Sequence, residues 1–164
     1  MFYSRFLETV GRFPDAIAVE MQHSVPTSTE GQAAPDDDVE RYNYVQLRRM
    51  AESIGNWLHQ NGIANGARCA ILAANSPQWL ATHLGIVAAG NAVVPLDTAF
   101  HDDQVTKLLL DSGATLLFVD EKFRPLAERS VADLDVRLVS ILGPPNGLPS
   151  LDAMFASGPG NFTP

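Results

Sequence analysis

The side chains that could do acid–base, nucleophilic or metal chemistry are few and lie far apart along the chain. A single cysteine cannot build a thiolate metal site, and the histidines show no close pairing with one another. They are His23, His59, His83 and His101. His83 lies in an apolar segment and is interpreted as a hydrogen-bonded core residue, whereas His101, with Asp102 and Asp103, marks a helix start. The sequence therefore predicts no catalytic and no metal-binding residue in this chain.

Phosphate binding is the next chemistry to test, because glycine-rich loops between a strand and a helix cradle nucleotides. Neither the dinucleotide pattern of three spaced glycines nor the P-loop pattern occurs. Gly143 follows an expected strand, but Pro144 and Pro145 lack the N–H groups that bind phosphate. At the helix start at Ser76, Pro77 removes one donor and the serine caps another, so capping is favoured over anion binding. No cofactor-binding residue is predicted.

Two further groups have structural explanations. The run Asp36-Asp37-Asp38 could attract a hard cation, but its Pro- and Gly-containing surroundings are typical of a solvated acidic turn. Cys69 lies inside an expected strand rather than at a helix start, where a thiol would be activated. Since no serine stands in a nucleophile-elbow pattern, a hydrolase is not indicated.

Composition and charge exclude several classes of protein. The 164 residues suit one domain, and 19 acidic against 11 basic residues give a net charge of −8. Such a chain repels nucleic acid and anionic membranes, and Arg48-Arg49 is its nearest approach to a basic cluster. No window of about 18 residues is free of polar groups, so no transmembrane segment is expected. The single cysteine and the absence of a secretory signal lead us to expect a cytoplasmic protein.

The segment 75–97 organises the expected fold. It contains a helix start at Ser76, an almost wholly apolar helix, a stop at Gly90 and a short strand that ends in Pro95-Leu96-Asp97. A helix without a polar face must be covered on every side. We therefore expect this segment to lie in the middle of a layered α/β core.

Helical and strand patterns alternate through the rest of the chain. Further helices are expected over 2–13, 43–62, 102–112 and 122–128, the first two ending near Pro14 and Gly62 and the last limited by Pro125. Strands are expected over 16–21, 41–44, 70–73, 93–94, 116–119 and 137–142. The predicted fold is α/β, a mostly parallel sheet with helices on both faces.

Two local features complete the expected fold. The first two strands should form an N-terminal antiparallel pair across a polar loop at 22–40. Asn43 and Gln46 should form a capping box at the start of a helix whose apolar face includes Val45, Leu47 and Trp57.

The chain divides near residue 142. Residues 1–142 carry the alternating pattern, whereas residues 143–164 are rich in Gly and Pro, with one helical turn expected over 151–155. We interpret 1–142 as an α/β subdomain and 143–164 as a linker. Because the chain stops in such a segment, we expect it to be the front portion of a longer protein.

Two segments resemble motifs of the adenylate-forming (AMP-binding) superfamily. Asn43-Tyr44-Val45-Gln46-Leu47 resembles the first core motif, usually Thr-Tyr-x-Glu-Leu, and residues 87–97 resemble the second. The segments between them, including Asn75-Ser76-Pro77, follow the family's order, and the resemblance covers about 6–123. Asn43, Gln46 and His101 depart from the usual residues, and each change is tolerable in a cap.

The resemblance implies the N-terminal part of an enzyme that activates a carboxylate with ATP to an acyl-adenylate. In that superfamily these motifs are mainly structural, and the phosphate loop, nucleotide contacts and catalytic lysine come later in the chain. The fragment alone is thus expected to be inactive and to hold no cofactor, with ATP, Mg and CoA used by the full-length enzyme. Segment 75–79 looks most like the long-chain fatty acyl-CoA synthetases.

Two alternatives stay open: an amino-acid-activating adenylation domain, and a stand-alone flavodoxin-like interaction module. The expected partners are the rest of the same chain and, in the full-length enzyme, a carboxylic acid and CoA. Apolar surface left for missing subdomains should make the fragment self-associate.

Overall fold

The computed structural model describes residues 2–22 and 39–164. Most of the loop expected at 22–40, with His23 and Asp36-Asp37-Asp38, lies outside the described residues. The helices are α1 (Phe2–Arg12), α2 (Tyr44–Gln60), α3 (Pro77–Ala88), α4 (Asp102–Ser112), the 3-10 turn η2 (Glu121–Phe123), α5 (Arg124–Ser130) and α6 (Leu151–Ser157). The strands are β1 (Ile17–Gln22), β2 (Val39–Asn43), β3 (Arg68–Leu72), β4 (Ala92–Pro95), β5 (Leu116–Val119) and β6 (Arg137–Ser140).

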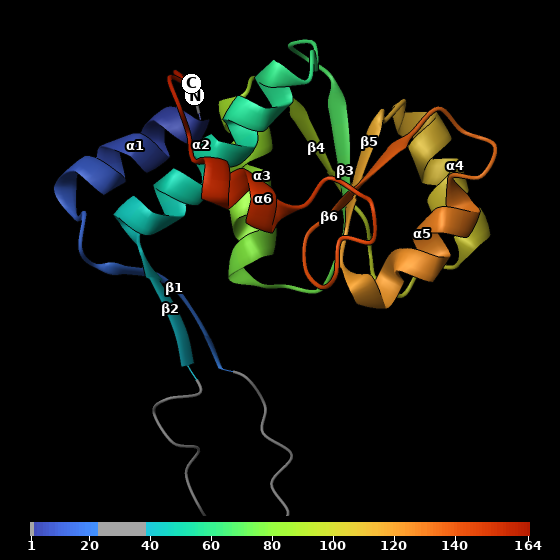
Figure 1. Cartoon of the computed structure of the whole chain (residues 1–164), viewed down its shortest axis with the longest axis horizontal. Coiled ribbons are helices and arrows are strands. Elements are labelled where there is room, and N and C mark those ends of the chain that lie inside the picture. Colours follow the sequence, from blue (N-terminus) through green and yellow to red (C-terminus); the bar gives the residue numbers. More distant parts are fainter. Residues whose placement is uncertain (1, 23–38) are drawn as a thin grey trace, which may run out of the picture.

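Four parallel strands form the central sheet, in the order β4-β3-β5-β6. Successive side chains of β3 point to opposite faces. Cys69 and Ile71 join the core cluster that includes residues of α2, α3 and α6, whereas Ala70 and Leu72 join the cluster beneath α4 and α5. Figure 1 shows these helices on the two sides of the sheet. The predicted fold class is confirmed.

The start of α2 has the predicted capping box. Asn43 Oδ1 accepts a hydrogen bond from the Gln46 N–H at 2.8 Å, and Gln46 Oε1 accepts from the Asn43 N–H at 2.9 Å. The prediction that Val45 lies on the buried face is wrong, because this side chain is 46% exposed. Val45 precedes buried Leu47 by two residues, which places it about 200° away around the helix.

Helix α3 lies close against α2. A Cβ atom on Gly85 would lie 2.6 Å from the Ala51 carbonyl oxygen and 2.7 Å from Ile54 Cβ. The glycine therefore lets the two helices approach to a distance that no side chain would allow. None of the α3 residues is fully exposed, although Leu80 and His83 are only half-buried, so the expected cover on every side is incomplete there.

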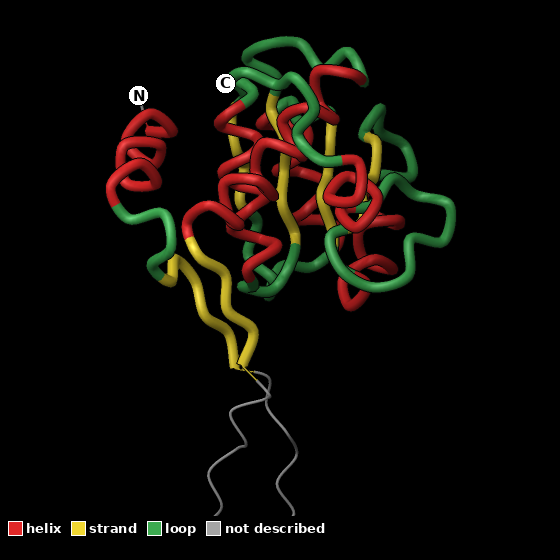
Figure 2. The backbone as a smooth tube through the Cα atoms, turned by 60° about the vertical axis from the view of Figure 1, so that its left-hand side comes forward, coloured by secondary structure: helices red, strands yellow, loops and turns green. Residues whose placement is uncertain are grey.

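Helix α1 and the antiparallel pair β1–β2 form a unit that we call the N-terminal wing, residues 2–22 and 39–43. The strand pair has Glu20 opposite Arg41 and confirms the prediction. Figure 2 shows this ribbon extending away from the parallel sheet. The wing is joined to α2 through Tyr3, whose hydroxyl donates to Glu52 Oε1 at 3.5 Å in a buried contact.

The C-terminal elements differ in detail from their prediction. Pro125 lies in the first turn of α5 and so helps to start this helix, where we had expected it to limit one. Strand β6 ends at Ser140, two residues earlier than expected. Residues 143–164 contain α6, which packs on α2 and buries Leu151 and Met154. The division of the chain at residue 142 stays a prediction.

Candidate functional site

The connections of the sheet reverse direction between β3 and β5. Helix α3 leads from β3 to β4 on one face, and α4 then leads past β3 to β5 on the opposite face. In open parallel sheets, ligands bind in the crevice that such a reversal opens at the carboxyl ends of the strands. The ends of β3 and β5 are therefore the first place to look for a site (Figure 1).

A side chain of the protein itself bridges this crevice. Asp120, the residue after β5, is 6% exposed. Its Oδ2 accepts a hydrogen bond from the Ala74 N–H beyond β3 at 2.9 Å, and its Oδ1 accepts from the Phe123 N–H at 3.2 Å. The carboxylate thus ties the ends of two strands together and caps η2. The arrangement suits a structural joint better than a ligand site.

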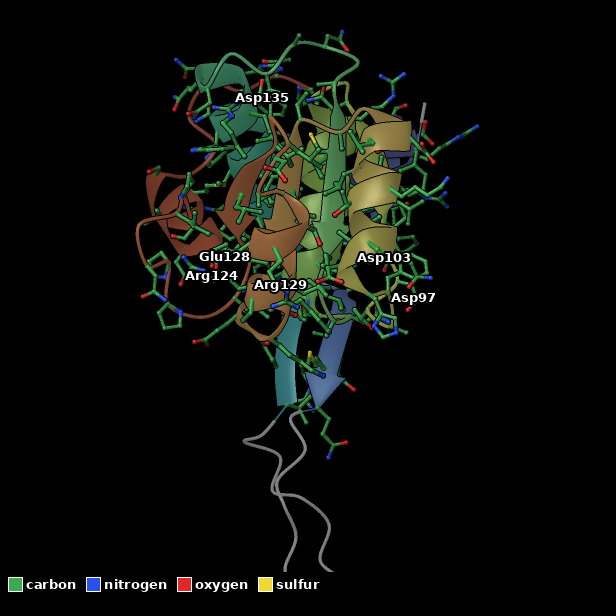
Figure 3. All side chains as sticks on the ribbon, turned by 90° about the vertical axis from the view of Figure 1, so that its right-hand side faces the viewer. Asp97, Asp103, Arg124, Glu128, Arg129 and Asp135 are labelled. Atoms are coloured by element: carbon green, nitrogen blue, oxygen red, sulfur yellow. The ribbon has the colours of Figure 1, made fainter. Side chains whose placement is uncertain are left out.

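The loop after β6 presents acceptors where a phosphate loop would present donors. Arg124 donates from Nη1 to the carbonyls of Pro144 and Pro145, at 3.4 and 3.2 Å, and from Nη2 to that of Asn146 at 3.3 Å. Its Nε also contacts Glu128 Oε1 at 2.9 Å (Figure 3). Carbonyl oxygens that bind a guanidinium group would repel a phosphate.

The helix start at Ser76 is capped as predicted. Ser76 Oγ accepts a hydrogen bond from the Trp79 N–H at 3.0 Å, and Pro77 occupies the first helical position. A hollow of about 280 Å³ lies beside it, and its lining includes Val19 and Met21 of β1. The described residues around this hollow include no cation that would hold an anion there.

His83 is not the hydrogen-bonded core residue that the sequence predicted. Its ring stacks on Trp79, with centroids 5.5 Å apart, and meets the edge of Phe2 at 6.1 Å. Nδ1 is buried and finds no hydrogen-bond partner among the described residues. Burial lowers the pKa of His83. Instead of the expected hydrogen bond, His83 makes a stack within α3 and an edge contact with α1.

The remaining candidates have structural roles. Cys69 is fully buried, and burial raises the pKa of its thiol to about 12, so it stays protonated. His101 directly precedes α4, and its N–H donates to Gln104 Oε1 at 3.0 Å. The hydrogen bond from Arg129 lowers the pKa of Asp102. Within the described ranges, no three His, Cys, Asp or Glu side chains are placed to hold a metal ion.

A mostly apolar hollow lies between the wing and the helices α2 and α3. It measures about 350 Å³. Its apolar lining is Phe2, Phe6, Ala18, Leu47, Leu80 and Leu84. Phe13 and Ile17, on the same wing, are 51% and 54% exposed. We call this hollow and the two exposed side chains the wing surface. None of the helices in the described part of the chain is long and apolar enough to cross a membrane.

Comparison with known proteins shows the family in which this architecture is found. The family model described as AMP-binding enzyme matches residues 6–153. A linear gramicidin synthase of Brevibacillus parabrevis is 34% identical over 95 residues, which cover 56% of this chain and 2% of that protein. A fatty acid–acyl-carrier-protein ligase of Streptomyces coeruleorubidus is 30% identical over 114 residues, covering 70% of this chain and 20% of the ligase.

Solved structures agree with the fold. A long-chain-fatty-acid-CoA ligase of Archaeoglobus fulgidus superposes on 98% of this chain with a TM-score of 0.80, at 17% identity. An acyl-CoA synthetase of Brucella canis superposes on 84% with a TM-score of 0.68, at 27% identity. This chain spans 30% and 27% of those two proteins. The fold is that of the N-terminal subdomain of adenylating enzymes, and the chain belongs to the AMP-binding enzyme family.

Proposed function

We propose that this chain is the N-terminal scaffold of an ATP-dependent ligase, one that activates a carboxylate to an acyl-adenylate and transfers the acyl group to CoA. The observation that carries the proposal is the family match over residues 6–153, which includes both motif segments. The bridged crevice at Asp120 and the carbonyl-lined loop at Arg124 agree with a scaffold role, because both replace a ligand with contacts inside the chain.

A fatty acid is the substrate class that we favour. The similarity to the ligase of Streptomyces coeruleorubidus and to the acyl-CoA synthetase of Brucella canis supports it. The 34% identity to the gramicidin synthase favours the alternative, in which the full-length protein activates an amino acid. In either case ATP and Mg would bind residues outside this segment, and the enzyme would work in the cytoplasm.

The natural partner of this segment is the rest of the same polypeptide, and we place their contact at the wing surface. When that partner is missing, exposed Phe13 and Ile17 would drive self-association of the 164-residue chain. Light scattering should show an apparent mass that rises with protein concentration. At the same concentration, an Ile17→Ser variant should have a lower apparent mass than the unmodified chain. A strict monomer at high concentration would argue against this contact.

Pyrophosphate exchange into ATP tests the main proposal. The purified 164-residue chain should give no carboxylate-dependent exchange above a blank without protein. The longer polypeptide that contains it should give exchange with fatty acids. Exchange with amino acids instead would favour the peptide-synthetase alternative. Exchange by the 164-residue chain alone would contradict the scaffold role, and a gene that ends after Pro164 would favour an interaction module.

A further inference from the structure

The two edges of the parallel sheet differ in how their backbone groups are paired. β6 forms one edge, and alternate N–H groups along it point toward β5 or away from it. Ser140 points away. Its N–H donates to the Pro149 carbonyl at 2.8 Å, and Ser140 and Ser150 form a parallel bridge. Residues 149–150 therefore occupy part of this edge already.

β4 forms the other edge, and its outward backbone groups are unpaired. The N–H groups of Ala92 and Leu96 donate on the β3 side, each across 2.9 Å. By the same alternation, the N–H and carbonyl of Val93 point away from β3, as does the carbonyl of Pro95, which has no N–H of its own. The described part of the chain offers these groups no hydrogen-bond partner. The β4 edge can therefore pair with a further strand.

The side chains of β4 are also only half covered. None of its residues is buried, whereas neighbouring β3 is buried from Cys69 to Leu72. Val93 packs against the core cluster on the α3 face, and Val94 packs against the cluster on the α4 face. A strand beside β4 would be covered on both faces in the same way. Because such strands consist of unbroken apolar runs, the segment that fits this edge is a short apolar run.

The face on which a connecting helix lies predicts where the next parallel strand joins the sheet. Crossovers are right-handed almost without exception, so a helix on a given face leads in one direction only. α3 leads from β3 toward the β4 edge, whereas α4 and α5, on the opposite face, lead toward β6. α6 lies on the face of α3. A parallel strand that follows α6 should therefore lie in the direction of β4 and, since the positions in between are taken, beyond it.

Residues 158–164 carry the chain toward the start of β4. Phe162 packs so closely on α2 that a Cβ atom on Gly55 would lie 2.5 Å from its Cζ. Pro164 then lines a hollow of about 260 Å³ with residues of α1 and α3 and with Gly90, in the turn that leads into β4. Figures 1 and 2 both show the C-terminus at the upper end of the molecule, as they do the loop before β3. Pro164 thus lies at the end of the sheet from which a strand parallel to β4 would start.

We propose that the polypeptide beyond residue 164 adds a parallel strand to the outer edge of β4. The inference rests on the proposed function, because it requires the longer ligase, and this chain spans only 30% and 27% of the two solved ligases described above. The added strand accepts a hydrogen bond from the Val93 N–H and donates to the carbonyls of Val93 and Pro95. Its side chains cover Val93 and Val94.

Hydrogen exchange of single amides, in the 164-residue chain and in the longer polypeptide, tests the proposal. In the 164-residue chain the Val93 amide should exchange freely, whereas the Val94 amide, which points toward β3, should be slow. In the longer polypeptide the Val93 amide should exchange at least roughly 100-fold more slowly, because it opens only when the new sheet edge opens. An unchanged Val93 amide would overturn the proposal, as would slowing at outward-pointing Leu138 of β6 instead.

Matched proline variants of the longer polypeptide show whether a strand is the cause. Val93→Pro removes the outward donor of β4 and leaves the N–H groups that point toward β3 in place. It should accelerate exchange in one apolar segment beyond residue 164 by roughly tenfold, the effect of one lost hydrogen bond. Leu138→Pro removes the equivalent donor of β6 and should leave that segment unchanged. Equal effects of the two variants would contradict pairing at β4.

The pyrophosphate assay separates this inference from the proposed function. If the longer polypeptide activates a carboxylate while its Val93 amide exchanges freely, the added strand is refuted and the ligase function stands. If the Val93 amide is protected but no carboxylate supports pyrophosphate exchange, the strand is supported and the ligase function is refuted.

Discussion

The parallel sheet and the N-terminal wing differ in how their strands are covered. Every residue of β5 is buried, whereas β1 and β2 contain no buried residue. The sheet has helices on both faces, while the ribbon extends away from the sheet, and its contacts with α2 and α3 leave none of its residues buried (Figure 2). A two-stranded ribbon is at best marginally stable alone. The sheet with α2–α5, which we call the body, should therefore carry the stability, and the wing should depend on its neighbours.

The largest difference should appear when one side chain is shortened in each region. Phe118 of β5 is fully buried, and Phe118→Ala should lower the free energy of unfolding by about 3–5 kcal/mol because it leaves a cavity. Ile17 of β1 is 54% exposed, so Ile17→Ala should cost less than about 1 kcal/mol. Denaturant unfolding of both variants measures this, and equal losses would contradict the comparison.

Two helical glycines give the next effect. Gly85→Ala should destabilise the body by about 1–3 kcal/mol, because the new Cβ atom would meet the Ala51 carbonyl oxygen and force the helices apart. Gly11→Ala in the wing meets open space. It should stabilise α1 by up to about 1 kcal/mol. Thermal unfolding followed by circular dichroism would show shifts of opposite sign, and a stabilising Gly85→Ala would rule out the close contact.

The smallest effect on the free energy of unfolding is expected at His83, where the wing and the body meet. Its pKa in the folded protein lies below the ordinary value of 6.5. As the pH falls through 6.5, His83 therefore binds a proton more readily in the unfolded chain than in the folded protein. The free energy of unfolding decreases as a result. Replacement by His83→Gln should make the decrease between neutral pH and about pH 5 smaller. A His83 pKa at or above 6.5, measured by NMR, would contradict this.

Much of the body could be predicted from sequence because its signals are local. The capping box at Asn43 and the serine cap at Ser76 each involve residues three apart, and both are present. The unbroken apolar run in β3 is typical of a strand covered on both faces, and the two core clusters lie on its two faces. These features depend on neighbours in the chain and not on how the whole molecule packs.

The features that were missed connect residues far apart in the sequence. Asp120 reaches the Ala74 N–H across 46 residues, and Phe162 meets Gly55 across an even longer stretch. An aspartate directly after an apolar strand was the available signal for the first contact. A glycine in the middle of a helix was the signal for the second, but neither signal identifies its partner. For the candidate site, sequence predicted a lack of phosphate-binding loops but not the side chain that bridges the crevice.

The strand order also limits when the body can fold. β3 pairs with β4 on one side and with β5 on the other, and both partners follow it in the chain. During synthesis, both edges of β3 can therefore be paired only after residue 119 has left the ribosome. β6 then adds to an edge that already exists. A chain truncated before Leu116 and released from the ribosome should expose one edge of β3 to chaperones, whereas a released chain truncated just before Arg137 should form a three-stranded sheet.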